Sequence, residues 1–246
     1  MYSLIQPLRF LCMPARFKGG IASFCFDDAP QSAWLNGSAI LAEYGYRATY
    51  FIATGMAGTH SPIFSESLMD WQEIHAAHER GHEIASHTST HCVVSSNSDV
   101  QFMQEIIAAK QTLAEHALIM RGQCGFAYPK GVVPHGKAAR KVRATYGYAR
   151  SIIPDVNHWP YNRYCVKAHA LYENRNPIAN IRRILKTVCY ENSWVVFYVH
   201  DVKNRCSKFG CTTTYFSEIV RAVHESNVTV KTIAQILLAP QQNSGQ

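Results

Sequence analysis

Several features that would assign the 246-residue sequence to a broad class at once are missing from it. No stretch approaches the ~20 apolar residues of a membrane-spanning helix, so we expect no transmembrane segment. None of the eight cysteines forms a Cys-x-x-Cys pair; Cys206 and Cys211 could form a disulfide or bind a metal, but their spacing is not diagnostic. Charged residues make up only 17%, and no nucleic-acid-binding module accompanies the net charge of +7. We therefore expect a globular protein that does not bind nucleic acid.

The first 19 residues also lack the long apolar stretch and the small-residue cleavage site of a secretory signal. Several cysteines stand in or beside apolar runs, which fits free buried thiols in a reducing compartment. We therefore interpret the protein as cytoplasmic. A chain of this length suits one α/β domain, and we expect it over residues 1–246, with a core over about 20–238, an extension over 1–19 and a tail over 240–246.

Short apolar segments alternate along the chain with longer segments of helical periodicity. Several of the short segments are apolar on both faces, as parallel strands covered by helices are. This order predicts a parallel sheet under a helical layer, and its seven or eight units favour a closed or partly closed barrel over an open doubly wound sheet, which is the alternative. We predict strands at 21–26, 49–52, 83–85, 125–128, 148–151, 164–167, 194–199 and 227–230, and helices at 33–44, 70–80, 99–117, 136–146, 177–188, 215–226 and 232–238. The predicted inward face of the longest helix is Val100, Met103, Ile106, Ile107 and Leu113.

Polar residues follow four of the predicted strands, at the point where each strand ends. Asp27 and Asp28 follow the first, His87 and His91 the third, the turn 129–131 the fourth, and His200 the seventh. Taken singly, each is more simply explained as a helix cap, a surface histidine or a core histidine. The carboxyl ends of parallel barrel strands lie on one face, however, so all four groups would converge there. Their coincidence favours a functional site.

The residue types in this set indicate a metal centre. His87 and His91 are four positions apart, so in a helical turn they would project from the same side. Two imidazoles and one carboxylate make the three-ligand set of hydrolytic zinc sites, which leaves positions open for water and substrate. Adjacent side chains on an extended backbone diverge, so one carboxylate of the Asp27–Asp28 pair would bind the metal and the other would be free to act as a base.

Four segments resemble, in order, the motifs of the polysaccharide deacetylase family. This is carbohydrate esterase family four, which includes chitin, peptidoglycan and nodulation-factor deacetylases. The matching segments are Ser23-Phe24-Cys25-Phe26-Asp27-Asp28, Ser86-His87-Thr88-Ser89-Thr90-His91, Phe126-Ala127-Tyr128-Pro129-Lys130-Gly131 and Val196-Phe197-Tyr198-Val199-His200, and the resemblance covers roughly residues 20–238. It implies the family's α/β fold, an irregular, incomplete, TIM-like (β/α) barrel of seven to eight parallel strands.

The resemblance also implies a role for each matching residue. Asp28, His87 and His91 would bind a divalent metal, zinc first, with Co²⁺, Ni²⁺ or Mn²⁺ as alternatives. Asp27 would be the general base and His200 the general acid. The implied reaction removes an N-acetyl group from an amino sugar or oligosaccharide by hydrolysis. The expected cytoplasmic location favours a precursor as substrate, either a nucleotide-linked or lipid-linked amino sugar or an oligosaccharide. Whether the protein forms oligomers is left open.

The third and fourth motifs depart from the family pattern. Ala127 stands where the family has an arginine that contacts the catalytic aspartate, and we predict that Arg150, at the end of the next strand, replaces it. We also predict that the backbone N–H of Tyr128 helps to stabilise the oxyanion. The fourth motif is not clean, so Asp155 and Asp201 are rival candidates for orienting His200.

Substrate contacts are predicted at Pro129, Trp159 and Tyr161, the last two by stacking on a sugar ring. The loop 203–211, which carries Lys203, Arg205 and Lys208, would either contact an anionic part of the substrate or be solvated. Two rival functions stay open. One is hydrolysis of a linear or cyclic non-sugar amide on the same scaffold. The other is carbohydrate binding by a protein whose catalysis is impaired by the missing arginine.

Overall fold

The computed structural model describes residues 19–94, 99–119 and 122–238, so nearly all of the predicted extension and the whole predicted tail lie outside it. Eight strands form one sheet in the order β7-β6-β5-β2-β1-β9-β8, and β10 pairs with the start of β1 on the side of β2. Every pairing in this sheet is parallel, as predicted. The strands are β1 (Ile21–Asp27), β2 (Ala48–Ile52), β5 (Glu83–Ser86), β6 (Gly125–Ala127), β7 (Tyr148–Arg150), β8 (His169–Ala170), β9 (Trp194–Val199) and β10 (Thr229–Val230).

The sheet curls until its two edges are joined by the segment 163–170. Within this segment, Val166 forms an isolated parallel bridge with Arg150 of β7, and β8 pairs with β9. Because a bridge rather than a full strand makes the first of these connections, the barrel is irregular and incomplete, as expected, and the open sheet is excluded. The strand predicted at 164–167 is wrong: Tyr164 lies in a turn closed by the Cys165 N–H on the Asn162 carbonyl, and the strand follows only at β8.

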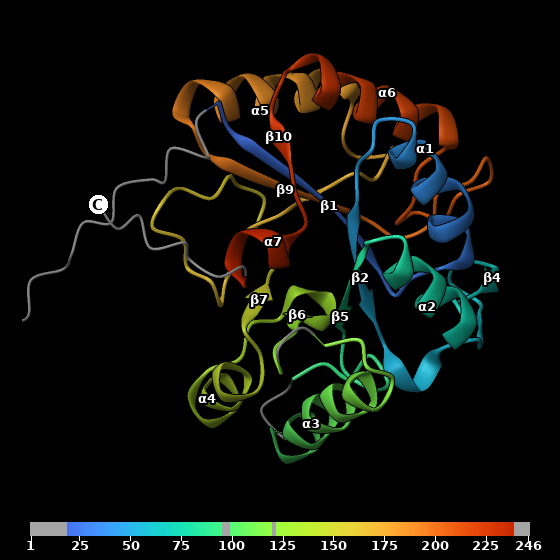
Figure 1. Cartoon of the computed structure of the whole chain (residues 1–246), viewed down its shortest axis with the longest axis vertical. Coiled ribbons are helices and arrows are strands. Elements are labelled where there is room, and N and C mark those ends of the chain that lie inside the picture. The colour runs from blue at the N-terminus through green and yellow to red at the C-terminus, as the bar shows by residue number, and fades with distance from the viewer. Residues whose placement is uncertain (1–18, 95–98, 120–121, 239–246) are drawn as a thin grey trace, which may run out of the picture.

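Helices surround the curled sheet, with α5 and α6 along the top of Figure 1, α1 and α2 at the right and α3 and α4 at the bottom. They connect successive strands, as the alternating sequence pattern predicted. The predicted helix 33–44 is divided into a π-helical turn, Ala33–Gly37, and the short α1. A hairpin of β3 (His60–Ser61) and β4 (Glu66–Ser67) was not predicted. The helices are α1 (Ser38–Ala42), α2 (Trp71–Glu79), α3 (Asp99–Glu115), α4 (Gly136–Thr145), α5 (Ile178–Glu191), α6 (Thr213–Glu225) and α7 (Ile233–Leu237).

The predicted inward face of α3 is rotated from the observed one. Val100 and Ile107 are 66% and 42% exposed, whereas the buried stripe repeats every three to four residues. The cause is the aromatic ring of Phe102, which packs edge-on against Phe126 of β6, with 6.3 Å between the ring centroids, and fixes the helix rotation. The buried residues are Phe102, Ile106, Ala109 and Leu113.

The two ends of the barrel are built differently. At the amino ends of the strands, α7 covers the barrel, and its first amides donate to the Thr49 hydroxyl and to the Glu83 carboxylate. A capping box between Thr232 and Gln235 holds the start of this helix. The strands β1 and β9 are buried along their whole length, so they form a fixed frame between the two ends. Because α7 covers the amino ends of the strands, a functional site is expected at their carboxyl ends.

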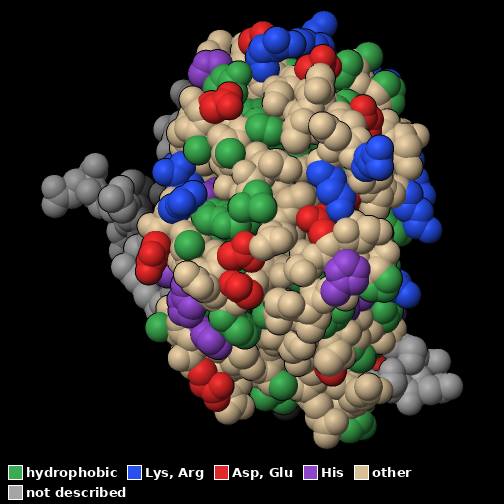
Figure 2. Space-filling view, turned by 90° about the vertical axis from the view of Figure 1, so that its right-hand side faces the viewer, with side chains coloured by type: hydrophobic (Ala, Val, Ile, Leu, Met, Phe, Trp, Pro, Cys, Tyr) green, Lys and Arg blue, Asp and Glu red, His purple; other side chains and the backbone are tan. Residues whose placement is uncertain are grey.

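On the face drawn in Figure 2, lysine and arginine side chains lie in the upper and middle parts of the view, with aspartate and glutamate side chains among them. None of the helices in the described part of the chain is long and apolar enough to cross a membrane. The seven cysteines within the described ranges are all free, so Cys206 and Cys211 do not form a disulfide.

Candidate active site

Parallel strands bring the predicted residues to one end of the barrel. Strand β1 ends at Asp27, β5 at Ser86, β6 at Ala127, β7 at Arg150 and β9 at Val199. The residues at or just beyond these positions therefore share the carboxyl-end face. Three of them form a cluster whose ligand atoms all lie within 4.8 Å of one another: Asp28, His87 and His91.

The three side chains meet because the backbone turns sharply at two of them. Asp28 and His91 have φ of 58° and 57°, in the left-handed region, and the Nε2 atoms of His87 and His91 each lie 3.7 Å from Asp28 Oδ1. The segment 87–91 is not helical, so the predicted helical turn is wrong. It is a bend instead, in which the Thr88 hydroxyl accepts the Cys92 N–H.

Glu105, on α3, holds this bend in place. Its Oε2 accepts the backbone N–H groups of Ser89 and Thr90 at 2.9 and 2.7 Å, and its Oε1 accepts the Thr90 hydroxyl at 2.9 Å. Glu105 was not predicted, because a glutamate on the partly exposed side of a helix carries no sequence signal of a loop-binding role. Through Glu105, the longest helix positions one metal-ligand candidate.

His87 is buried and neutral. Its Nδ1 lies 2.8 Å from the carbonyl oxygen of Ala127, and a carbonyl can only accept, so Nδ1 carries the proton. Burial lowers the pKa of His87 to about 3, which keeps the ring uncharged at neutral pH. The lone pair of Nε2 then faces Asp28. A neutral imidazole anchored through its other nitrogen is the usual form of a metal-binding histidine.

Asp28 has an oxygen that the protein leaves unsatisfied. Its Oδ1 is buried and has no hydrogen-bond partner among the described residues, while burial raises the pKa of the carboxyl group to about 6. Burial likewise lowers the pKa of His91. A desolvated carboxylate oxygen facing two neutral imidazole nitrogens is the donor set that a divalent ion such as zinc requires, so these residues fit a metal.

Asp27, the last residue of β1, forms a buried ion pair with Arg150. The Nη2 atom of Arg150 lies 2.6 Å from both carboxylate oxygens, and both residues are almost completely buried. Burial alone would raise the pKa of Asp27, but the Arg150 guanidinium holds it below its usual range. The guanidinium carbon lies 4.9 Å from the ring centroids of Phe51 and Tyr198. Asp27 therefore stays ionised.

His200 lies across the cluster, with Nε2 3.9 Å from Asp28 Oδ2. Neither of the predicted orienting acids contacts it. Asp201 is buried in its own loop, where it accepts the Ser207 N–H and hydroxyl, and Asp155 is exposed and paired with Lys167 at 2.7 Å. Instead, the Tyr172 hydroxyl faces His200 Nδ1 at 3.4 Å. No sequence motif identified Tyr172, because it follows a short strand that the sequence did not predict.

The predicted oxyanion donor is already engaged. The Tyr128 N–H donates to the carbonyl oxygen of Arg150 at 3.0 Å, in the ladder between adjacent strands. This hydrogen bond corrects the assignment of that amide to the oxyanion. Pro129, the first residue of a short 3-10 turn (Pro129–Gly131), is buried and follows the β6 strand end as expected.

The two aromatic residues predicted to stack on a sugar lie at the wrong end of the barrel. Tyr161 packs against Trp159 and against Trp194, each at 5.1 Å between ring centroids. Trp194 is the first residue of β9, whereas His200 follows its last, about 20 Å away at ~3.3 Å per residue. The loop after β7 returns to the amino ends of the strands, which corrects the assignment of Trp159 and Tyr161 to the substrate.

Lys203, in the loop beyond His200, is committed to the protein. Its Nζ lies 3.0 Å from Glu66 Oε1 and donates to the Phe64 carbonyl. Lys203 is therefore not available to contact an anionic part of the substrate, which was one of the two predicted alternatives for this loop. The ion pair instead joins the loop to strand β4, beside the Phe64 ring that packs 5.4 Å from His200.

An irregular parallel barrel with a two-histidine, one-carboxylate cluster at its carboxyl end defines a metal-dependent hydrolase of the (β/α) barrel class. The chain belongs to the polysaccharide deacetylase family, because the sequence model of that family, described as polysaccharide deacetylase, matches residues 15–150, more than half of the chain. It is therefore a deacetylase that hydrolyses a carbon–nitrogen bond other than a peptide bond in N-acetylated sugars.

Solved structures show the same fold. The chitin deacetylase from the fungal pathogen Colletotrichum lindemuthianum is 16% identical, with a TM-score of 0.62 over 92% of this chain and 91% of that one. A family 4 carbohydrate esterase from Streptomyces lividans, in complex with acetate, is 20% identical, with a TM-score of 0.56 over 86% and 92%. At these identities the likeness establishes the fold alone. A comparison of the sequence with curated proteins returned no match.

Proposed function

We propose that Asp28, His87 and His91 hold the divalent ion of this deacetylase, zinc as the first candidate and Co²⁺, Ni²⁺ or Mn²⁺ as alternatives. The observation that carries the proposal is the unsatisfied Oδ1 of Asp28, which lies 3.7 Å from each of two imidazole nitrogens. When bound, the ion would polarise the acetyl carbonyl and bring the pKa of water down towards ~7. All remaining steps fall to side chains of the chain itself.

Asp27 acts as the general base. It is ionised because Arg150 stabilises its charge, so it is ready to accept the proton of the attacking water at neutral pH. Arg150 supplies the guanidinium that the third motif lacks, and it fixes the carboxylate through both oxygens. This support favours an active enzyme over the rival reading of an impaired carbohydrate-binding protein.

His200 acts as the general acid. An amine leaves poorly unless it is protonated, and His200 Nε2 lies 3.9 Å from Asp28 Oδ2, whereas His87 and His91 lie nearest the other oxygen, Oδ1. Tyr172 orients the ring at Nδ1, and the rings of Phe64 and Phe209 pack on it at 5.4 and 5.6 Å. Since the Tyr128 amide is engaged, we assign no backbone donor to the oxyanion. The nucleotide or lipid linkage of the sugar and the cytoplasmic location remain predictions of the sequence.

Metal content and acetate release, measured together, test the proposal. The purified protein would be assayed on N-acetylglucosamine, its oligomers, nucleotide-linked N-acetyl sugars and simple linear and cyclic amides. We expect one divalent ion per chain and acetate from the sugars, and loss of both in Asp28→Ala. The exposed Asp155→Ala serves as the matched control and retains both.

Three outcomes contradict parts of this proposal. Full metal content in Asp28→Ala would refute the ligand assignment. Turnover of simple amides but not sugars would favour the rival non-sugar amide hydrolase. Metal and sugar binding without acetate release would favour the binding protein.

A further inference from the structure

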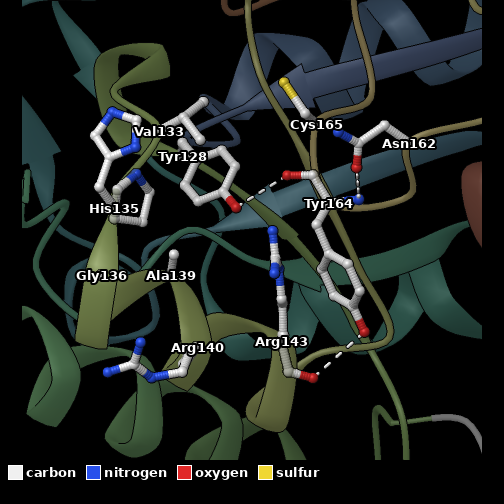
Figure 3. Close-up of a pocket in the computed structure, with 11 residues that line it drawn as sticks. Tyr128, Val133, His135, Gly136, Ala139, Arg140, Arg143, Asn162, Tyr164 and Cys165 are labelled. Atoms are coloured by element: carbon white, nitrogen blue, oxygen red, sulfur yellow. Dashed lines mark hydrogen bonds between the residues drawn. The ribbon is translucent and has the colours of Figure 1, made fainter. Parts of the chain in front are cut away.

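A cavity of about 410 Å³ lies between α4 and the segment 162–165 (Figure 3). It is separate from the metal-ligand cluster. Ala127 and Tyr128 are consecutive residues at the end of β6, and their contacts lie on different sides. The Ala127 carbonyl accepts from His87, whereas the Tyr128 side chain lines the cavity and donates to the Tyr164 carbonyl at 3.1 Å. Volumes of roughly 300–1,000 Å³ are typical of small-molecule sites.

The charge of the cavity lining is entirely positive. Arg140 and Arg143 are three residues apart on α4, so their side chains share one side of the helix. Neither forms an ion pair among the described residues, and the segments outside them contain no aspartate or glutamate that could supply one. By contrast, Arg150 and Arg182 each pair with a carboxylate. Two guanidinium groups at one cavity thus lack an anion.

The wall beside these arginines is held in position. The Tyr164 hydroxyl donates to the carbonyl oxygens of Arg143 and Tyr146 at 3.3 and 3.2 Å, and Asn162 Oδ1 accepts the Tyr164 N–H. In Figure 3 the Arg143 side chain rises from α4 between the rings of Tyr128 and Tyr164, and its guanidinium carbon lies 5.9 Å from the Tyr164 ring centroid. The aromatic wall is therefore fixed before any ligand binds.

We propose that this cavity binds a phosphorylated small molecule, with the phosphate on Arg140 and Arg143 and an adjoining ring against Tyr164. A phosphate group presents several acceptor oxygens and more than one negative charge, which matches two guanidinium forks better than a single carboxylate does. No acidic residue lines the cavity, so nothing there repels an anion. The phosphate could belong to a sugar substrate or to a separate ligand, and the experiment distinguishes these sources.

Binding is measured by calorimetry at low ionic strength, with N-acetylglucosamine 1-phosphate, inorganic phosphate and uncharged N-acetylglucosamine as probes. We expect the sugar phosphate to bind most tightly, and Arg140→Gln or Arg143→Gln to weaken it at least about tenfold, since charge-assisted hydrogen bonds are lost. Lys137→Gln is the matched control, because it removes the same charge from the same helix at a residue outside the cavity lining. We expect it to change affinity less than about twofold.

No detectable binding of either phosphate probe by the unmodified protein would overturn the proposal, and so would an equal loss in Lys137→Gln. Thermal melting of each variant checks folding, and the main-chain carbonyl of Arg143 that binds Tyr164 is kept in the glutamine variant. The binding test needs no turnover, so failure of the proposed catalytic roles leaves it intact.

The KM values of the Arg143→Gln variant for phosphorylated and uncharged sugars then distinguish the two sources of the phosphate. If the phosphate belongs to the substrate, Arg143→Gln raises KM for the phosphorylated sugar and leaves KM for the uncharged sugar unchanged. If it belongs to a separate ligand, both KM values stay unchanged, and calorimetric binding persists at saturating uncharged substrate. Both results uphold the cavity as a phosphate site and differ only in what carries the group.

Discussion

Two partly buried carboxylates, Glu83 and Asp28, lie at opposite ends of the barrel and differ in their hydrogen-bond partners. At the amino end, Glu83 accepts three hydrogen bonds: one from Tyr148 at 2.5 Å, one from Thr49 at 2.7 Å and one from the Ala234 amide at 2.8 Å. At the carboxyl end, Asp28 has a buried oxygen without any partner among the described residues. Burial raises the pKa of both groups.

This difference distinguishes a buried carboxylate that stabilises the fold from one that is available to bind a ligand. A desolvated carboxylate is costly unless hydrogen bonds or a cation compensate it. Glu83 is compensated by the fold itself, because its donors come from β2, β7 and α7 and join these elements. Asp28 Oδ1 instead lies 3.7 Å from the Nε2 atoms of His87 and His91, and the nitrogen of His87 is an acceptor because its Nδ1 carries the proton. The protein thus leaves this oxygen without a hydrogen bond, as the proposed role of Asp28 as a metal ligand requires.

The largest effects are expected when each carboxylate is replaced by its amide. Asp28→Asn should lose bound metal and reduce activity to background, while metal-free protein keeps its stability, because no hydrogen bond is removed at Oδ1. Glu83→Gln should keep metal and activity but lose about 1–3 kcal/mol of unfolding free energy, since one of its donors is left unpaired. Metal analysis, acetate release and urea unfolding measure the three quantities. If Glu83→Gln also lost its metal, the proposed difference between a structural Glu83 and a metal-binding Asp28 would be wrong.

Asp27 both stabilises the fold, through its ion pair with Arg150, and is the proposed general base. Substitutions of the two partners separate these roles. Asp27→Asn should retain metal and lower kcat by about 10²–10⁴, the range for loss of a general base. Arg150→Met should lose about 3–5 kcal/mol of unfolding free energy, because it leaves Asp27 buried without its partner. The double variant should regain most of that stability but none of the activity. A double variant as unstable as Arg150→Met would show that packing, not charge pairing, is lost.

The sequence predicts best those features that depend on local pattern. Strand β9 was predicted with its observed bounds and β1 within one residue, because long apolar runs buried on both faces leave little choice of position. The two-residue strand β8 exists only through its pairing with β9, and no local pattern marks it. The face of α3 likewise depends on where Phe102 meets Phe126 in space.

The same rule holds for the site. The clustering of Asp28, His87 and His91 could be predicted because Asp28 and His87 directly follow strand ends, His91 is in the loop after β5, and strand ends share one face. Trp159 and Tyr161 were misplaced because the loop that carries them returns to the amino end, a path that sequence alone does not indicate. Tyr172 was missed because its relation to His200 exists only in the folded chain.

A smaller effect is expected at Tyr172, which supports His200 from outside the carboxylate cluster. A hydrogen bond as long as 3.4 Å is weak, so Tyr172→Phe should lower kcat only about two- to tenfold, the equivalent of one ordinary hydrogen bond. The loss should be greater for amide substrates than for activated acetyl esters, because only the amine needs a proton from His200. The exposed Tyr190→Phe is the control. Equal losses on both substrates would remove Tyr172 from the acid function.

The smallest effect is a pH dependence at Glu83. Because burial raises its pKa in the folded state above the unfolded value of about 4.3, the folded protein binds the proton more tightly. The stability that Glu83 contributes is therefore fully present below about pH 4 and declines as pH rises through the folded pKa. Urea unfolding of the unmodified protein and Glu83→Gln across this range isolates the group, since all other titrations are shared. A difference in unfolding free energy that grows with pH would mean that the hydrogen bonds from Tyr148, Thr49 and Ala234 outweigh burial, and that this carboxylate is held as an anion in the fold.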